Sequence, residues 1–166
     1  MTAVTIRPER AEDAAAIADV TTAAFTNAGH GNGGEAGIIQ RLREQGDLAL
    51  SLVAENEARI VGHVALSPVT ISDGSTDWYG LGPISVWPDA QGTGIGFRLM
   101  QRTIADMRAR HARGIVLLGD PAFYHRFGFE HDAALVYPGP LSEYFQRLIL
   151  SGPAPRGVVT YASAFA

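Results

Sequence analysis

The stretch from Leu81 to Met107, LGPISVWPDAQGTGIGFRLMQRTIADM, decides which fold we expect for this chain. It begins with a short apolar run, Ile84 to Trp87, and breaks at Pro88-Asp89. After the break, apolar residues recur at helical spacing: Ile95, Leu99, Thr103, Ile104 and Met107. A glutamine and three glycines stand where that helix must start: Gln91, Gly92, Gly94 and Gly96. The pattern predicts a strand, a tight turn and a helix whose unpaired N–H groups face outward, which is a binding site for phosphate.

Two familiar phosphate loops fit this turn poorly. A P-loop requires a lysine directly after its last glycine, but Phe97 and Arg98 follow Gly96, and the chain contains no lysine. A dinucleotide fingerprint has the spacing G-x-G-x-x-G, whereas these glycines are spaced G-x-G-x-G and the unit lies in the middle of the chain. A glycine-rich helix start without a ligand remains the plain alternative.

The composition indicates one globular domain, residues 1–166, with 46% hydrophobic and 18% charged residues. The net charge of −4 and the scattered positions of the 13 arginines argue against a nucleic-acid partner. Because the chain has no cysteine, disulfides, thiolate nucleophiles and cysteine-ligated metals are excluded. Its start, MTAVTIRPER, is charged where a signal peptide would be apolar, and no later run has membrane-spanning length. We therefore expect a cytoplasmic protein and no membrane partner.

Before the central stretch, the pattern predicts three elements of regular structure and a loop: a strand at Val4 to Arg7, a helix at Glu9 to Phe25, a mobile loop at Thr26 to Gly34 and a helix at Glu35 to Glu44. His30 and Glu35 are the ionisable residues around this loop. We interpret His30 as solvated and Glu35 as a helix-start charge, with substrate contact as the second interpretation. Two strands follow, at Leu48 to Glu55 and at Arg59 to Ile71. On the second of them, His63 lies opposite the apolar set, and we expect it to be half-exposed.

Beyond the central stretch, Gly114 to Asp120 (GIVLLGD) predicts a strand buried on both faces. Next comes PAFYHRFGF, Pro121 to Phe129, which predicts a short aromatic helix that Gly128 ends. The remainder predicts three elements: a strand at Ala133 to Tyr137, a helix through Tyr144 to Leu150 and a strand at Val158 to Ala162.

Two of these motifs together resemble the coenzyme A segments of the GNAT (Gcn5-related) N-acetyltransferase superfamily. The first is QGTGIG after a strand ending V-x-P, and the second is GIVLLGD followed by FYHRFGF, similar to F-Y-x-x-x-G-F. The resemblance is specific over Leu81 to Phe129 and architectural elsewhere, and the ending GVVTYASAF resembles one bacterial subgroup of predicted acetyltransferases. It implies a single α/β domain with a mixed sheet, flanking helices, and two central parallel strands that splay apart.

The resemblance also implies an activity: an acyltransferase that moves an acetyl group from its cosubstrate acetyl-CoA to a primary amine by direct attack in a ternary complex. The implied cofactor-binding residues are Ile84, Ser85, Val86, Gln91, Gly92, Thr93, Gly94, Ile95 and Gly96. No metal site is expected. The acceptor is a small-molecule or peptide amine whose identity the sequence leaves open. The sequence also leaves open whether the chain forms a homodimer. An acyl-CoA-binding regulatory module without transferase activity is the second hypothesis.

Tyr124 matches the position of the family's general acid. A phenol with a pKa of about 10 is protonated at neutral pH and can protonate a departing thiolate, whose conjugate acid has a pKa of about 8.5. The structural alternative is a core aromatic residue packed with its phenylalanine neighbours.

The sequence assigns no general base. The strand from Trp78 to Trp87 contains no Asp, Glu or His. The candidates elsewhere are Asp77, Asp120, His125, His63 and Glu35. A chain of ordered water that hands the proton to bulk solvent is an equal alternative.

Overall fold

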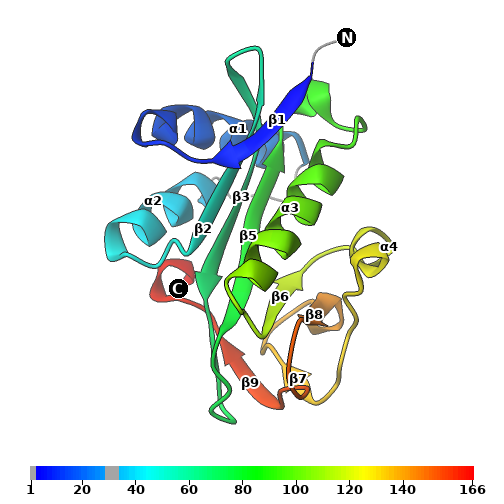
Figure 1. Cartoon of the computed structure of the whole chain (residues 1–166). Coiled ribbons are helices and arrows are strands. Elements are labelled where there is room, and N and C mark those ends of the chain that lie inside the picture. The colour runs from blue at the N-terminus through cyan, green and yellow to red at the C-terminus, as the bar shows by residue number, and fades with distance from the viewer. Residues whose placement is uncertain (1–2, 29–33) are drawn as a thin grey trace.

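The computed structural model of the chain describes residues 3–28 and 34–166, which form two β-sheets (Figure 1). The strands of the larger sheet lie in the order β1 (Val4–Pro8), β2 (Leu50–Asn56), β3 (Arg59–Pro68), β5 (Trp78–Val86), β6 (Gly114–Leu118) and β8 (Phe145–Ile149). Those of the smaller sheet lie in the order β4 (Thr70–Ile71), β9 (Gly157–Thr160) and β7 (Leu135–Val136). Parallel and antiparallel pairs both occur, which confirms the predicted mixed α/β class.

Helices cover both faces of the larger sheet. The α-helices of the described residues are α1 (Ala14–Ala28), α2 (Glu35–Gln45), α3 (Ile95–Ala109) and α4 (Pro121–Tyr124). Figure 1 shows α1 and α2 on one face and α3 on the other. Leu52 and Leu99 belong to the apolar core under α3, and Val20 and Val53 belong to the core under α1 and α2. Within residues 3–28 and 34–166, each helix is too short or too polar to cross a lipid bilayer.

Because both faces are covered, our expectation for His63 is wrong. Strand β3 is exposed only at its two end residues, and the exposed fraction of His63 is 0%. Strand alternation does place His63 opposite the apolar set that includes Val64. The second face is nevertheless interior, because α1 packs against β3 there. That contact joins segments far apart in the chain, so the pattern of the strand alone does not contain it.

Strands β5 and β6 are parallel neighbours only where they begin. Residues 78–80 pair with residues 114–116. β5 then continues beside β3 to Val86, and the described chain shows no further pair between β5 and β6. The two central parallel strands therefore part, as the resemblance implied, and the later half of β5 has an open edge.

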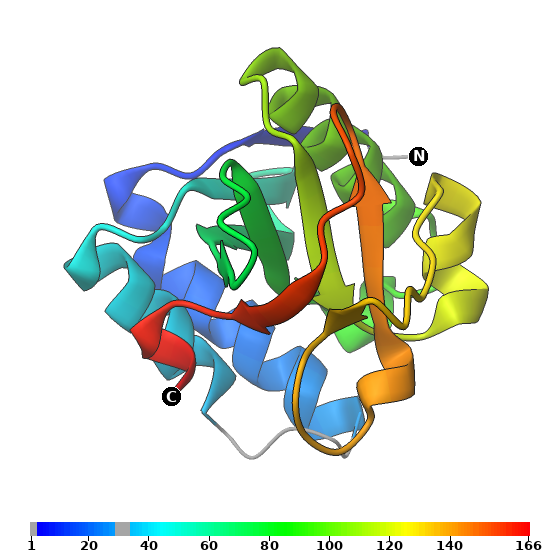
Figure 2. The ribbon, with the colours of Figure 1, turned by 90° about the horizontal axis from the view of Figure 1, so that it is seen from below.

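The segment Tyr144 to Leu150, predicted as part of a helix, is strand β8 instead. It pairs antiparallel with β6, from Leu118↔Phe145 to Gly114↔Ile149. A short apolar run does not distinguish a strand from a buried helix by its periodicity. Here the free edge of β6 favours a strand, because it offers hydrogen-bond partners to the backbone of the whole segment. Figure 2 shows β8 alongside β6.

Smaller differences concern the ends of elements. Helix α1 continues through Ala28, so residues 26–28 of the predicted loop are helical, and its residues 29–33 lie outside the described residues. His30 lies outside the described residues. The single strand predicted over Arg59 to Ile71 is divided at Val69 into β3 and β4, which belong to different sheets.

Candidate active site

A cavity of about 280 Å³ lies where β5 parts from β6. It is bordered by α1, by the start of α3 and by α4. The residues that line it are Ala24, Phe25, Ile84, Ser85, Val86, Gln91, Gly96, Phe123 and Tyr124. The structure thus brings both sequence motifs to one place, although Gly96 and Tyr124 are far apart in the chain. Gly92, Thr93 and Gly94 form the turn that leads to this cavity.

The glycine turn exposes backbone at the start of α3. The φ angles of Gly92 (79°) and Gly94 (88°) are positive, which glycine adopts at little cost. A Cβ at either position would meet no atom within 4 Å, so the space above the turn is open. In the described chain no side chain caps the helix at Gly94, and its first N–H groups are left to an external acceptor. Ile95 is 5% exposed and points into the core, so only its backbone can serve a ligand.

The backbone of β5 alternates between β3 and the cavity. The amide of Trp87 donates to the carbonyl of Val61 on β3, with 2.8 Å between N and O. Alternate residues of an antiparallel strand direct their N–H and C=O groups to opposite sides. The backbone groups of Ser85 therefore face β3, and those of Ile84 and Val86 face the open edge.

Gln91 connects the turn to this edge. Its side-chain amide nitrogen donates to the carbonyl of Val86 over 3.1 Å. The family resemblance implied that Gln91 binds the cofactor. In the structure, its amide occupies the carbonyl of the last β5 residue and fixes the turn against the strand.

Tyr124 forms the opposite wall, and its ring is held by close neighbours. Phe123 contacts it edge-on, with ring centroids 4.9 Å apart. A Cβ at Gly119 would lie 2.3 Å from the Tyr124 ring, so the ring can sit there only because residue 119 is glycine. The Asp120 carboxylate begins α4 by accepting the amide of Ala122 over 2.9 Å, which positions the helix that carries Tyr124.

The electrostatics of the cavity keep the Tyr124 phenol protonated. Burial raises the pKa of Tyr124 to about 12, and the charge of Asp120 adds to the increase. A phenol with this pKa is neutral throughout the physiological range. It can therefore donate a proton and does not act as a base near pH 7.

Among the described residues that line the cavity, none is an aspartate, glutamate or histidine. Asp120 serves as the cap of α4, and His125 is exposed just after that helix. Glu35 is the first residue of α2. Within residues 3–28 and 34–166, no group of three or more acidic or histidine side chains could hold a metal ion. Ser85 is a polar residue of the cavity lining, and its side chain is buried.

Comparison with known proteins places this architecture among the acetyltransferases. A family model described as an acetyltransferase (GNAT) domain matches residues 5–131. The uncharacterized N-acetyltransferase YhbS of Escherichia coli K12 is 37% identical over 129 residues, which cover 75% of this chain and 77% of that protein. The uncharacterized N-acetyltransferase YjhQ of the same strain is 35% identical over 134 residues, covering 77% of this chain and 71% of that protein.

Two solved structures are similar over nearly the whole chain. A GNAT family acetyltransferase from Brucella melitensis in complex with acetyl-CoA has a TM-score of 0.88 and 44% identity, with 99% of both chains covered. The E. coli YhbS structure in complex with CoA has a TM-score of 0.91 and 31% identity, covering 99% of this chain and 93% of that one.

Proposed function

This chain belongs to the GNAT acetyltransferase family, and on that premise we propose that it transfers an acetyl group from acetyl-CoA to a primary amine by direct attack in a ternary complex. One observation carries the proposal: the open edge of β5, the glycine turn and Tyr124 meet at a single cavity. The complexes of the Brucella and E. coli relatives with acetyl-CoA and CoA support acetyl-CoA as the cosubstrate.

The residues present suit such a ligand. The thioester of acetyl-CoA supplies an activated acetyl group, and the task of the chain is to hold and orient it. The N–H groups at Gly92 to Gly96 would donate hydrogen bonds to the pyrophosphate, because a helix start attracts negative charge. The backbone groups of Ile84 face the cavity and would pair with the amides of the pantetheine arm, as an added strand does.

Two groups of the chain would act on the reacting atoms. The Val86 N–H faces the open edge of β5 and would donate to the thioester carbonyl oxygen, which stabilises negative charge as it develops there. The Tyr124 hydroxyl would give its proton to the sulfur that leaves. Because the pKa of Tyr124 is raised to about 12, the tyrosinate that this transfer leaves takes up a proton again at neutral pH.

One observation favours the second candidate, a cofactor-binding module that transfers nothing. In the part of the chain that the structure describes, the cavity lining contains no carboxylate and no imidazole that could take the proton of an amine. Such a module would bind acetyl-CoA with the same residues and would release no thiol in the presence of any amine.

A screen of amine classes with a free-thiol readout tests the proposal. We expect acetyl-CoA to raise the melting temperature, since a ligand at about 100 times its Kd adds about 2.7 kcal/mol of stability, and NADH and ATP to do much less. We also expect at least one amine class to release CoA at a rate above that of hydrolysis. Stabilisation by acetyl-CoA without turnover of any amine would favour the module. Absence of stabilisation would contradict both candidates.

A further inference from the structure

A row of buried polar side chains leads from the cavity across the larger sheet, on the face covered by α1. Ser85 lines the cavity, and His63 is its direct partner on β3. The His63 Nε2 atom lies 2.7 Å from the hydroxyl oxygen of Ser51 on β2. The Ser51 hydroxyl in turn donates to the carboxylate of Glu9, which follows β1. We call these four residues the polar row.

The hydrogen bonds fix the position of each proton in this row. Arg43 donates to both carboxylate oxygens of Glu9, over 3.0 and 3.1 Å. Burial opposes the charge of Glu9, but the hydrogen bonds from Arg43 and Ser51 outweigh it and lower the pKa of Glu9. Glu9 is therefore a hydrogen-bond acceptor, and Ser51 donates its only hydroxyl proton to it. Ser51 must then accept from His63, so the His63 proton is on Nε2 and its Nδ1 atom has a free lone pair.

The two remaining polar atoms of the row, His63 Nδ1 and Ser85 Oγ, are not joined by a hydrogen bond in the described structure. His63 is 0% exposed and Ser85 is 2% exposed. Among the residues that the structure describes, neither His63 Nδ1 nor Ser85 Oγ has a hydrogen-bond partner. Directly opposed residues of paired strands have Cβ atoms about 4.5–5.5 Å apart, a gap that a hydroxyl and an imidazole can span together. Two buried polar atoms without partners are costly to a fold, so their occurrence on facing residues points to a role.

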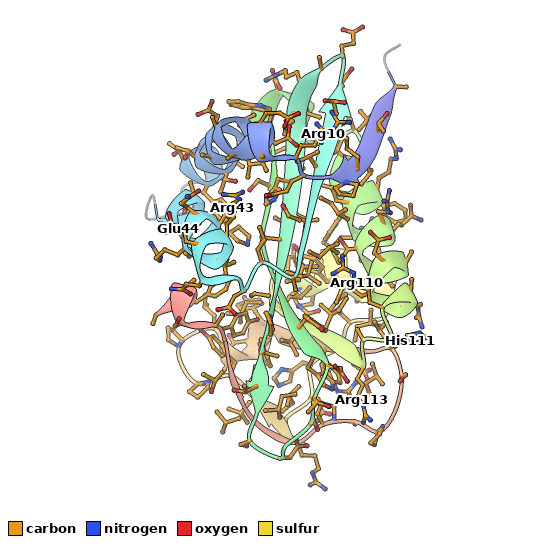
Figure 3. All side chains as sticks on the ribbon, turned by 60° about the vertical axis from the view of Figure 1, so that its left-hand side comes forward. Arg10, Arg43, Glu44, Arg110, His111 and Arg113 are labelled. Atoms are coloured by element: carbon orange, nitrogen blue, oxygen red, sulfur yellow. The ribbon has the colours of Figure 1, made fainter. Side chains whose placement is uncertain are left out.

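The other end of the row opens to solvent. Glu9, Arg43 and Ser51 line a second cavity, of about 360 Å³, on the far side of β3 from Ser85. Figure 3 labels Arg43 on α2 and Arg110 just after α3, which both border this second cavity. The Glu9 side chain is 18% exposed there. The polar row thus connects the candidate active-site cavity with a separate exit.

We propose that the polar row is a proton relay that removes the proton of the acceptor amine during acetyl transfer; this proposal rests on the proposed function. The bound ammonium first gives one proton to Ser85 Oγ, and the neutral amine then forms the C–N bond. As the C–S bond breaks, Tyr124 protonates the sulfur, and the second proton of the nitrogen returns to Tyr124. The first proton moves along the polar row. Ser85 passes its own proton to His63 Nδ1, His63 passes its Nε2 proton to Ser51, and Ser51 passes its proton to Glu9. Glu9 releases it into the second cavity. Rotation of the two hydroxyls and tautomerisation of His63, which returns its proton from Nδ1 to Nε2, restore the starting arrangement.

The relay supplies a route for the amine proton, for which the described residues of the cavity lining include no carboxylate or imidazole. Each member hands on one proton for each that it receives, so no charge accumulates in the interior of the sheet. Burial lowers the pKa of His63 to about 4. The charge of Glu9 raises this pKa, and the charge of Arg43 lowers it further. His63 is therefore neutral at physiological pH, which leaves its lone pair available for transfer.

The pH dependence of turnover distinguishes a relay from a merely structural role. Wild-type kcat/KM for the best alkylamine should change little between about pH 7 and pH 10, because the bound ammonium loses its proton on the protein. In Ser85→Ala and His63→Gln, only amine that is already neutral reacts. A free lysine-type amine has a pKa of about 10.4, so their rates should be about 10³-fold lower at pH 7 and should approach wild type near pH 10.

Ser67→Ala is the matched control. Ser67 lies on β3, on the same face as His63, and is equally buried with an unpartnered hydroxyl, but it is outside the polar row. We expect it to keep the wild-type profile. Stabilisation by acetyl-CoA checks that each variant folds, and Ser85→Ala alone suffices if His63→Gln does not.

Variants of Ser85 and His63 with the wild-type profile, or with the same loss at every pH, would overturn the relay and leave the acetyltransferase proposal standing. Absence of turnover by the wild-type protein with every amine class would overturn the proposed function, and the relay with it.

Discussion

The two faces of strands β3 and β5 differ sharply in chemistry although both are buried. The face under α3 is apolar, with Val64, Leu99 and Met100 in its core. The face under α1 carries polar side chains in the interior, among them His63 and Ser85. The first face can be explained by packing alone. The second retains groups whose burial works against stability, which indicates that they are kept for another reason.

The cavity lies where the two faces meet, at the open edge of β5. Tyr124 packs against the apolar core under α3, whereas Ser85 comes from the polar face under α1. The proposed proton donor and the proposed proton acceptor therefore approach the reacting atoms from opposite sides of one strand. Such separation keeps the two groups from exchanging protons directly with each other. The four predictions that follow probe this contrast, beginning with the largest expected effect.

Leu99 lies on α3 and is fully buried in the apolar face. Leu99→Ala should destabilise the fold by about 2–5 kcal/mol, the usual range for truncation of a buried leucine. The loss combines transfer free energy with the cavity left behind. Urea unfolding measures it, with Ser67→Ala on the other face as the comparison. A change below about 1 kcal/mol would mean that the apolar face is not the main source of stability.

His63 should make the fold sensitive to acid. In the unfolded chain it binds a proton near its ordinary pKa of 6.5, whereas in the fold burial lowers that pKa to about 4. The unfolded state therefore binds more protons between these values, so stability is fully present above about pH 6.5 and falls by about 3 kcal/mol as pH drops to about 4. Urea unfolding of the wild type and His63→Gln across this range isolates the contribution. Parallel curves for the two proteins would show that His63 is not buried as a neutral ring.

Tyr124→Phe keeps the ring and its packing but removes the hydroxyl. If Tyr124 is the general acid, kcat should fall by about 10²-fold or more while acetyl-CoA affinity changes little. Steady-state kinetics and thermal shift measure the two quantities separately. Full activity in this variant, with an unchanged pH profile, would return Tyr124 to a structural role and leave the apolar face without a chemical function.

Gly94→Val should weaken acetyl-CoA binding by about tenfold, because a side chain would stand where the pyrophosphate must reach the helix start. The positive φ of Gly94 also strains any substituted residue, so a matched control is needed. Gly74→Val supplies it, since Gly74 has a φ of 86° and open space around it in a turn outside the cavity lining. Calorimetry that finds equal affinities for both variants would remove the glycine turn from the binding site.

The sequence was most informative where structure is local. The helix start at Gly94 and the end of the aromatic helix at Gly128 depend on a few adjacent residues, and both lie where the pattern predicts them. Placing Gly96 and Tyr124 at one cavity needed the family resemblance, because no local pattern relates them.

The sequence was least informative where distant segments decide. Strand β8 exists because β6 offers an edge, and His63 is interior because α1 covers it. Glu9 and Ser51 escaped notice for the same reason. Only the paired register of β1, β2 and β3 brings them to His63, and an isolated serine within an apolar strand gives no sign of it.

The open edge of β5 also bears on solubility. Unpaired strand edges invite other polypeptides to add a strand, which is a common route to aggregation. Here the groups left free at this edge, the N–H and C=O of Ile84 and the N–H of Val86, lie at a cavity bordered by α1, α3 and α4. A second polypeptide strand would have to fit its side chains between these helices. The pantetheine arm that we propose for this edge has amides but no such side chains, so the helices would hinder it less than a strand of another protein.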